Sequence, residues 1–179
     1  MANTDAPDGF TPAKHMYGGT IRAARMRIAS GYGTLICSGD VVTLSSGYVQ
    51  QAGASDTPAG VFHGVFYNKS DGTPTFSNQW TASTATQGSE DAIAYVYNDP
   101  GIIYEAQFTA GTPAVSFIGN KYTISTTAGS TTNGRSKEGV TATTSSGIAL
   151  CVGFNLDPSN SIGASARAYF TFPTSTFAV

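Results

Sequence analysis

The stretch SGYGTLICSGDVVTLSSGYVQQAG, residues 30–53, decides the fold class because short apolar runs alternate in it with turn signals. Runs at 34–37, 41–44 and 48–51 are rich in β-branched and aromatic residues, which favour strands. The Ser-Gly-Asp and Ser-Ser-Gly segments between them favour turns. The stretch therefore predicts short strands and offers no catalytic group. The side chains expected to fill a small barrel are Leu35, Cys37, Val42 and Leu44.

The rest of the chain repeats this pattern of short strand-like runs between Gly-rich turns. In 164–172, alternation places the apolar side chains from Ala166 to Phe172 on one face, which is typical of a half-buried strand. The turn signal Asn-Asp-Pro-Gly at 98–101 predicts a hairpin between strands at 91–97 and 102–108. The hairpin residues expected on one face are Ile93, Tyr95 and Tyr97. Further strands are expected at 20–29, 59–67, 74–80, 114–118, 122–125 and 147–154, and a short helix around 83–90.

Two runs carry local features that affect this prediction. Gly60 and Gly64 interrupt the run 59–67, as bulges or close backbone approaches do. The run 20–29 has helical propensity in Ala-Ala-Arg-Met-Arg. Its polar and apolar residues nevertheless alternate, and it is short for a helix, so we expect a strand.

Together these runs predict an all-β fold, either a small β-barrel or β-tulip or a sandwich. Residues 1–20 hold several Pro and Gly residues among apolar ones and predict an extended N-terminal arm; the alternative is a disordered end. Residues 21–179 are expected to form a single all-β domain. Within it, 126–146 predicts a long Ser/Thr/Gly-rich loop, and such loops often make contacts.

The charge content is low and unevenly placed. Charged residues make up 11% of the chain, against about 25% in ordinary soluble proteins. Because Lys and Glu are depleted at interface cores, this favours a surface partly covered by other proteins; the alternative is a Ser/Thr-rich extracellular β protein. A net charge of -2 argues against a nucleic-acid partner.

Basic and acidic residues fall in separate stretches. These stretches predict either patches that meet in a head-to-tail contact or a partner, or ordinary solvated faces. The basic residues are Lys14, Arg22, Arg25 and Arg27, and the acidic ones are Asp71, Glu90, Asp91, Asp99 and Glu105.

Cys37 and Cys151 lie in apolar runs and are expected to be buried free thiols, although a bridge between them stays open. The N-terminus has neither a basic nor an apolar signal region, and no apolar run approaches the length of about 18 residues needed to span a membrane. We therefore expect synthesis and folding in a cytoplasm and no membrane partner.

Enzymatic motifs are sparse. His15 lies in the arm and His63 in a strand, and neither has a second ligand at short spacing. No nucleophile elbow, zinc-protease motif or phosphate-binding loop is present. The sequence predicts no enzyme, catalytic residue, metal or cofactor. A small hydrolase with a carboxylate pair remains an alternative, drawn from Glu90, Asp91, Asp99 and Glu105.

The aromatic residues offer a second alternative, a carbohydrate platform. Tyr and Phe at strand alternation more often belong to a core or an interface. The candidates for stacking on a sugar are Trp80, Tyr95, Tyr97 and Tyr104.

Several segments, taken in order, resemble a family of small tailed-phage virion proteins known as head decoration or capsid cement proteins. The segment Gly-Asp-Val-Val at 39–42, followed by Gly60-Val61, also resembles the wider lambda-like decoration class. The segments that carry the family resemblance are MANTDAPDGFTP at 1–12, His15, Gly18-Gly19, SGYGT at 30–34, AYVYNDP at 94–100, GSTTNG at 129–134 and GASA at 163–166.

The resemblance implies a β-barrel or β-tulip on the outside of an icosahedral bacteriophage capsid, in a protein made in the bacterial host cytoplasm. It implies that the protein binds the expanded shell, cements neighbouring major capsid protein subunits and stabilises the head against packaged DNA. It also implies a homo-oligomer, a trimer by analogy, with dimer and hexamer open.

Proteins of this kind commonly reach onto the lattice with an N-terminal arm, which matches residues 1–20 in position and composition. The arm residues expected to bind the capsid are Asn3, Phe10, Pro12, His15 and Tyr17, with Arg22, Arg25 and Arg27 as electrostatic contacts. The alternative is a carbohydrate- or receptor-binding β module of a virion.

Overall fold

The computed structural model describes residues 3–144 and 147–178, and the all-β prediction is confirmed. The helices in these ranges are two short 3-10 turns, η1 (Gln87–Ser89) and η2 (Val115–Phe117). The strands are β1 (Thr11–His15), β2 (Ala24–Ile28), β3 (Ile36–Cys37), β4 (Val41–Ser45), β5 (Tyr48–Gln51), β6 (Gly60–Asn68), β7 (Pro74–Ser77), β8 (Gln79–Trp80), β9 (Ala92–Tyr97), β10 (Ile102–Ala110), β11 (Lys121–Tyr122), β12 (Ile124–Ser125), β13 (Gly139–Thr141), β14 (Ala149–Phe154) and β15 (Arg167–Thr171).

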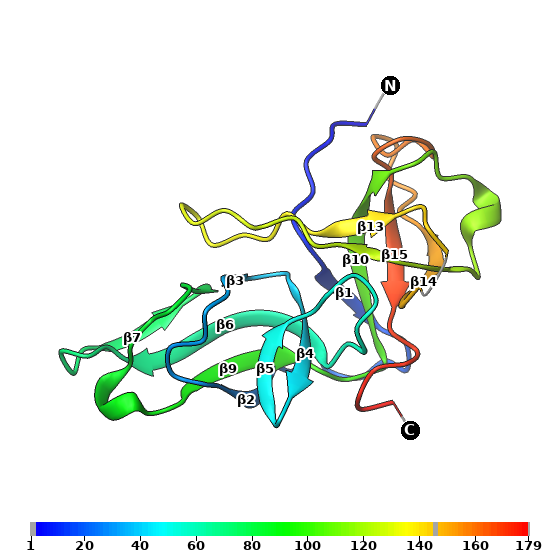
Figure 1. The fold of residues 1–179 in the computed structure, drawn as a ribbon. Coiled ribbons are helices and arrows are strands. Elements are labelled where there is room, and N and C mark those ends of the chain that lie inside the picture. The colour runs from blue at the N-terminus through cyan, green and yellow to red at the C-terminus, as the bar shows by residue number, and fades with distance from the viewer. Residues whose placement is uncertain (1–2, 145–146, 179) are drawn as a thin grey trace.

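The first half of the chain forms a small barrel, visible as the cyan-to-green body in Figure 1. Its strands follow the order β4-β5-β2-β9-β6, and a further pairing of β4 with β6 closes the ring. Strand β7 extends the sheet from β6, and β3 pairs with β8 beside it. We call this ring the first barrel.

The stretch 30–53 builds one side of the first barrel through the β4–β5 hairpin. Ser46 and Gly47 connect the two strands with φ values of 50° and 84°, the positive pair that a tight two-residue turn requires. Val42 and Val49 are fully buried, whereas Leu44 is half-buried. The local pattern therefore identifies the turn, and of the four predicted barrel-filling residues Cys37 and Val42 are fully buried. Leu35 is only half-buried, because its neighbour Ile36 takes the place in the core.

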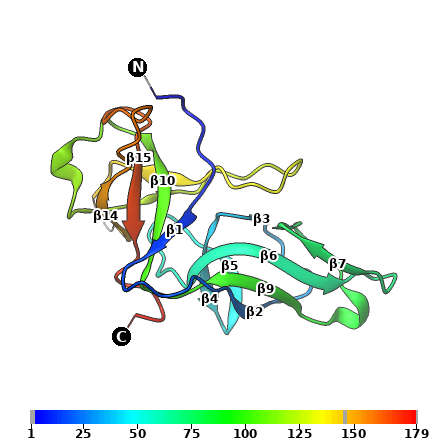
Figure 2. The same cartoon turned by 180° about the vertical axis from the view of Figure 1, so that it is seen from behind.

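The second half forms another ring, which we call the second barrel. Its strands follow the order β11-β14-β15-β10-β13-β12. Thr123 alone separates β11 from β12, and its carbonyl accepts the Thr141 N–H at 2.9 Å, so the two short strands act as one and close the ring. Figure 2 shows β1 lying against β10 on the side toward the first barrel.

Two separate buried clusters fill the two barrels. Alternation on β15 is confirmed, since Ala168 and Phe170 are fully buried. The cluster of the first barrel includes Ile28, Ile36, Val42, Val49, Phe62, Val65, Trp80, Ala92, Ala94 and Val96. The cluster of the second barrel includes Phe10, Tyr104, Phe108, Tyr122, Ile124, Val140, Cys151, Phe154, Phe170 and Phe172.

The predicted hairpin of 91–97 with 102–108 is wrong. Strand β9 pairs with β2 and β6, whereas β10 pairs with β1, β15 and β13. The turn itself forms, with the Gly101 N–H donating to Asp99 Oδ1 at 2.8 Å. The turn connects the two barrels. Strand β9 pairs with two strands of the first barrel, and β10 pairs with strands of the second, whereas a hairpin would pair the two only with each other.

Three smaller expectations also need correction. Residues 114–118 hold the turn η2 instead of a strand, and the helix expected around 83–90 is reduced to η1. The long loop at 126–146 contains β13, and its positions 145–146 lie outside the described residues.

Residues 126–138, which we call the strap, leave the second barrel and pack on the first. In Figure 1 the strap is the yellow loop that passes over the side of the first barrel carrying β3. Its backbone brackets Ser38, which donates to Gly134 O and accepts from Ser136 N–H, both at 3.0 Å. Asn78 Nδ2 donates to Asn133 O at 2.6 Å. Much of the predicted contact loop is therefore an internal connection.

The N-terminal segment is extended, as expected, but it is part of the body. Strand β1 pairs antiparallel with β10, and Phe10 is only 1% exposed among the rings of Phe170 and Phe172. Asn3 Nδ2 donates to the carbonyl oxygens of Ser161 and Ala164. A freely reaching arm over all of residues 1–20 is thus corrected to a docked segment; its first two residues lie outside the described ranges.

Candidate interaction surfaces

The predicted capsid-binding residues of the arm have different environments. Phe10 is not a surface contact, because its ring lies in the core of the second barrel. Asn3 and Pro12 are half-buried, and the amide of Asn3 is used within the chain. Tyr17 is 81% exposed and is open to a partner.

His15 organises the exposed turn that follows β1. Its Nδ1 accepts the N–H groups of Tyr17 and Gly19, each at 3.1 Å, and its Nε2 lies 3.1 Å from Asp99 Oδ2. The pKa of Asp99 is lowered, first by the Gly101 N–H and then by His15. The side chain of His15 is only 9% exposed. Its role is therefore to position the turn that exposes Met16 and Tyr17, and its own ring is not a surface contact.

The three predicted electrostatic contacts lie on or before β2. Arg27 Nη1 pairs with Asp91 Oδ2 at 3.2 Å, so this member of the basic stretch meets the acidic stretch within the chain. The guanidinium of Arg25 lies 5.9 Å from the ring centre of Tyr95, in cation–π range. Arg22 is exposed.

An aromatic face lies on the outside of the first barrel. Phe76 is 62% exposed, and its ring centre is 5.7 Å from that of Tyr95. Gly64 makes room for this contact, since a Cβ there would lie 3.1 Å from the Phe76 ring. We define the aromatic face as Arg25, Phe76 and Tyr95.

The other proposed sugar-stacking residues are less accessible. Trp80 is fully buried, and its Nε1–H donates to Tyr32 O at 2.9 Å. Tyr104 is 2% exposed, and burial raises the pKa of its hydroxyl. Tyr97 is half-buried and contacts His63. Tyr95 is thus the predicted candidate that the structure brings together with an exposed second ring.

A set of exposed apolar side chains, which sequence reasoning missed, lies on the second barrel. Leu156 is 87% exposed, Val115 64%, Ile118 45% and Val152 36%. The Gly119 N–H donates to Cys151 O at 2.8 Å, which places the segment holding Val115 and Ile118 beside β14. Val152 and Leu156 line one shallow hollow. We define Val115, Ile118, Val152 and Leu156 as the apolar rim. These residues are recognised only from their exposure in the folded structure, because nothing in the sequence distinguishes them from the buried apolar residues nearby.

The acidic residues considered for a hydrolase lie beside bases. Asp91 pairs with Arg27, Asp99 with His15, and Glu105 Oε1 lies 3.6 Å from Arg167 Nη1. Glu90 is exposed. This arrangement gives no support to a carboxylate pair among the four.

A different carboxyl pair does form, between Asp40 and Glu138, and both residues are fully buried. Burial raises the pKa of Asp40 from 3.8 to about 6 and raises that of Glu138 well above its usual range. The charge of Asp40 raises the pKa of Glu138 further. Sequence reasoning missed this pair because its members lie far apart along the chain.

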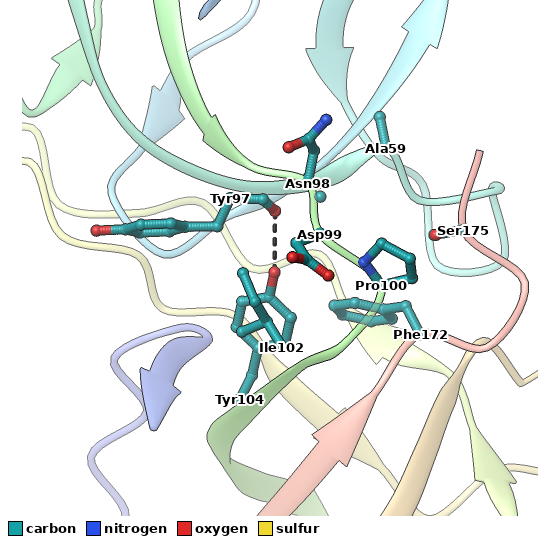
Figure 3. Close-up of a pocket in the computed structure, with 10 residues that line it drawn as sticks. Ala59, Tyr97, Asn98, Asp99, Pro100, Ile102, Tyr104, Phe172 and Ser175 are labelled. Carbon is teal, nitrogen blue, oxygen red and sulfur yellow. Dashed lines mark hydrogen bonds between the residues drawn. The ribbon is translucent and has the colours of Figure 1, made fainter. Parts of the chain in front are cut away.

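The turn at 98–101, which links the two barrels, encloses little space. Figure 3 shows Tyr104 donating its hydroxyl to Tyr97 O, at 2.9 Å, beside Asp99, Pro100 and Phe172. The cavity lined by these residues has about 10 Å³ of free volume. That volume suits one water molecule at most.

Several general properties complete the description of the surface. Cys37 and Cys151 are buried and unbridged, as predicted. Within residues 3–144 and 147–178, no group of three His, Cys, Asp or Glu side chains is arranged to hold a metal ion. The same ranges contain no helix that is long and apolar enough to cross a membrane.

Comparison with known proteins gives no relative for this chain. No protein-family model, curated protein or solved structure matches it.

Proposed function

We propose that the protein is a structural component of a tailed-phage virion that binds the outside of the expanded capsid. In this role it cements neighbouring major capsid protein subunits and stabilises the head. Copies associate with one another on the lattice, as a trimer by analogy with the lambda-like decoration class. Each contact is weak, and the many symmetry-related sites of a shell supply avidity.

The apolar rim is the observation that carries this proposal. Four apolar side chains of the second barrel are each at least one third exposed: Val115 and Ile118 in the segment beside β14, and Val152 and Leu156 around one shallow hollow. Exposed apolar groups that gather in this way mark protein interaction sites, whereas scattered ones need no explanation. The low charge content of the chain reduces the cost of covering the surrounding surface. The sequence resemblance supports the major capsid protein as the partner.

The turn after β1 supplies a second contact in this proposal. Tyr17 and Met16 are held outward by His15, and they lie in the part of the arm that is not buried. Phe10 instead anchors the segment from within. The capsid-binding surface is therefore the turn and the apolar rim, with the rest of the arm as their support.

The double substitution Val152→Ser with Leu156→Ser is expected to weaken binding to expanded capsids by about 30-fold or more, since it removes two apolar anchors. Co-sedimentation of purified protein with expanded capsids measures this loss. The matched control is Phe76→Ser, which removes an exposed apolar residue of the first barrel whose exposure, 62%, lies between those of Val152 and Leu156. Circular dichroism verifies that both variants are folded. Equal binding by the double variant and the unchanged chain would refute the rim as the contact.

A carbohydrate- or receptor-binding module is the second candidate, favoured by the aromatic face. The exposed ring of Phe76 lies against the half-buried ring of Tyr95 beside Arg25, an arrangement on which a sugar ring can stack. A glycan array separates the two candidates. Binding that is lost on Tyr95→Ala supports the module, whereas an array without hits, together with hundreds of copies per particle, supports the capsid role.

A further inference from the structure

The buried carboxyl pair lies where three distant segments of the chain cross. Asp40 immediately precedes β4 of the first barrel, and Glu138 ends the strap from the second barrel. Residues 9 and 10 of the N-terminal segment bond to both sides of this crossing, with the Gly9 N–H donating to Glu138 O at 3.1 Å and the Phe10 N–H to Gly39 O at 2.9 Å. The packing is tight enough that a Cβ on Gly9 would lie 2.6 Å from Gly39 O. This crossing therefore joins both barrels and the N-terminal segment.

The hydrogen bonds of Glu138 join the strap to the first barrel, whereas that of Asp40 stays within the first barrel. Glu138 Oε2 accepts the Val41 N–H at 2.8 Å, and its Oε1 accepts from Gln51 Nε2 at 3.4 Å. Asp40 Oδ2 accepts the Cys37 N–H at 2.7 Å. Glu138 thus fastens the strap to β4 and β5 of the first barrel.

The pair is short of donors for two ionised carboxylates. Asp40 Oδ1 is buried and has no hydrogen-bond donor in good geometry. An oxygen in that position is costly as part of a charged carboxylate and much less so in a neutral acid. The Cys37 N–H and the nearby Ser136 hydroxyl lower the pKa of Asp40, but burial outweighs them and the pKa is raised. Among the described residues, neither carboxyl forms an ion pair.

We propose that Asp40 and Glu138 form a proton-dependent clasp that holds the strap closed on the first barrel. With a proton on the pair the strap is fastened. When the pair loses its protons, repulsion between two buried charges favours an opened strap, in which water reaches both carboxylates. This inference concerns the chain itself and does not depend on the proposed function.

No neighbouring group offsets the charge. Cys37, on β3, is the titratable side chain beside the pair, and burial, followed by the charges of the two carboxyls, raises its pKa to about 12. On the strap, Arg135 and Lys137 are exposed. The guanidinium of Arg135 turns toward Asp8, 3.9 Å away, and Asp8 also pairs with Arg167.

The direction of the pH dependence follows from the raised pKa values. A folded-state pKa of about 6 for Asp40, against an unfolded value of 3.8, means that the closed form binds the proton more tightly. The closed clasp is therefore most stable below the unfolded value and loses stability as the pH rises through about 6. The raised pKa of Glu138 acts in the same direction and extends the loss to higher pH.

Cys37 is a built-in reporter of the clasp. Its side chain is fully buried, and Gly129 of the strap lies so close that a Cβ there would contact Cys37 Sγ. Opening of the strap therefore uncovers this thiol. Cys151 is also fully buried, but in the core of the second barrel, so it reports opening of that barrel or of the whole chain.

The test is the rate at which a thiol reagent labels each cysteine between pH 5 and pH 8, with peptide mass spectrometry assigning the site. Rates are divided by those of the same protein unfolded in urea, which removes the pH dependence of thiol chemistry. We expect Cys37 to be labelled faster than Cys151, with a normalised rate that rises at least about tenfold over this range. Low concentrations of urea should accelerate Cys151 and leave Cys37 nearly unchanged, because strap opening exposes little surface.

The double variant Asp40→Asn with Glu138→Gln should abolish most of the pH dependence at Cys37, and Glu138→Gln alone should reduce it. The control Asp157→Asn, at an exposed carboxyl of the second barrel, should retain the profile of the unchanged chain. The proposal is overturned if Cys37 and Cys151 share one rate and one urea dependence, or if the double variant keeps the full pH dependence. The profile of the unchanged chain decides the matter if a variant does not fold.

Discussion

Replacing Phe10 with alanine is expected to lower the free energy of unfolding by about 3–5 kcal/mol, the usual cost of removing a buried aromatic ring. The ring is 1% exposed and contacts Phe170 and Phe172, which both belong to the core of the second barrel. A cavity between β1 and β15 would remain, since the surrounding strands are fixed by their pairing. Urea denaturation followed by circular dichroism measures the loss.

Tyr17→Ala is the matched control for this experiment. Tyr17 lies in the same N-terminal segment and is 81% exposed, so its removal should change the free energy of unfolding by no more than about 0.5 kcal/mol. Equal and small effects at both positions would mean that the segment is a separable arm. A large effect at Phe10 alone means that truncations of residues 1–20 damage the fold before they report on binding.

Gly60→Ala is expected to destabilise the first barrel by about 3–5 kcal/mol, from backbone strain and overpacking together. Gly60 has φ of +152°, and a Cβ there would collide with the carbonyl oxygen of Tyr97. That oxygen cannot move away, because it accepts the hydroxyl of Tyr104 at the link between the barrels. Gly60 also pairs with Val42, where β4 and β6 close the ring.

Gly33→Ala provides the comparison for Gly60. A Cβ at Gly33 meets no atom within 4 Å, and the substitution should change stability by less than about 1 kcal/mol. Thermal unfolding of both variants separates the two cases. A Gly60 variant as stable as the Gly33 variant would contradict the close approach that closes the first barrel.

Local patterns predicted strands and inward faces well, because these depend on neighbouring residues. The turn at Ser46 and Gly47 and the buried face of β15 follow from residue type and alternation alone. Strand pairing did not follow, because it depends on distant segments. The turn at 98–101 has good hairpin chemistry, yet β9 and β10 pair within different barrels.

The interaction surfaces were harder to predict than the fold. Phe10 and Leu156 are both apolar residues in Pro- and Gly-containing segments, yet one is buried and the other is 87% exposed. Nothing local separates them, since the difference arises from packing against β10 and β15. In the sequence, Asp40 is part of a turn signal and Glu138 is part of a polar loop, so nothing local indicates that the two carboxyls meet. They meet because the strap, residues 126–138 of that loop, packs on the first barrel.

A reconstruction of the intact virion would test the proposed role, binding to the outside of a phage capsid, without any intermediate assumption. We expect density for the two barrels at symmetry-related positions on the outer surface of the expanded shell, in hundreds of copies. The apolar rim and Tyr17 should face the major capsid protein. Density confined to the tail or to a few copies per particle, or copies on the shell with the apolar rim in solvent, would contradict it.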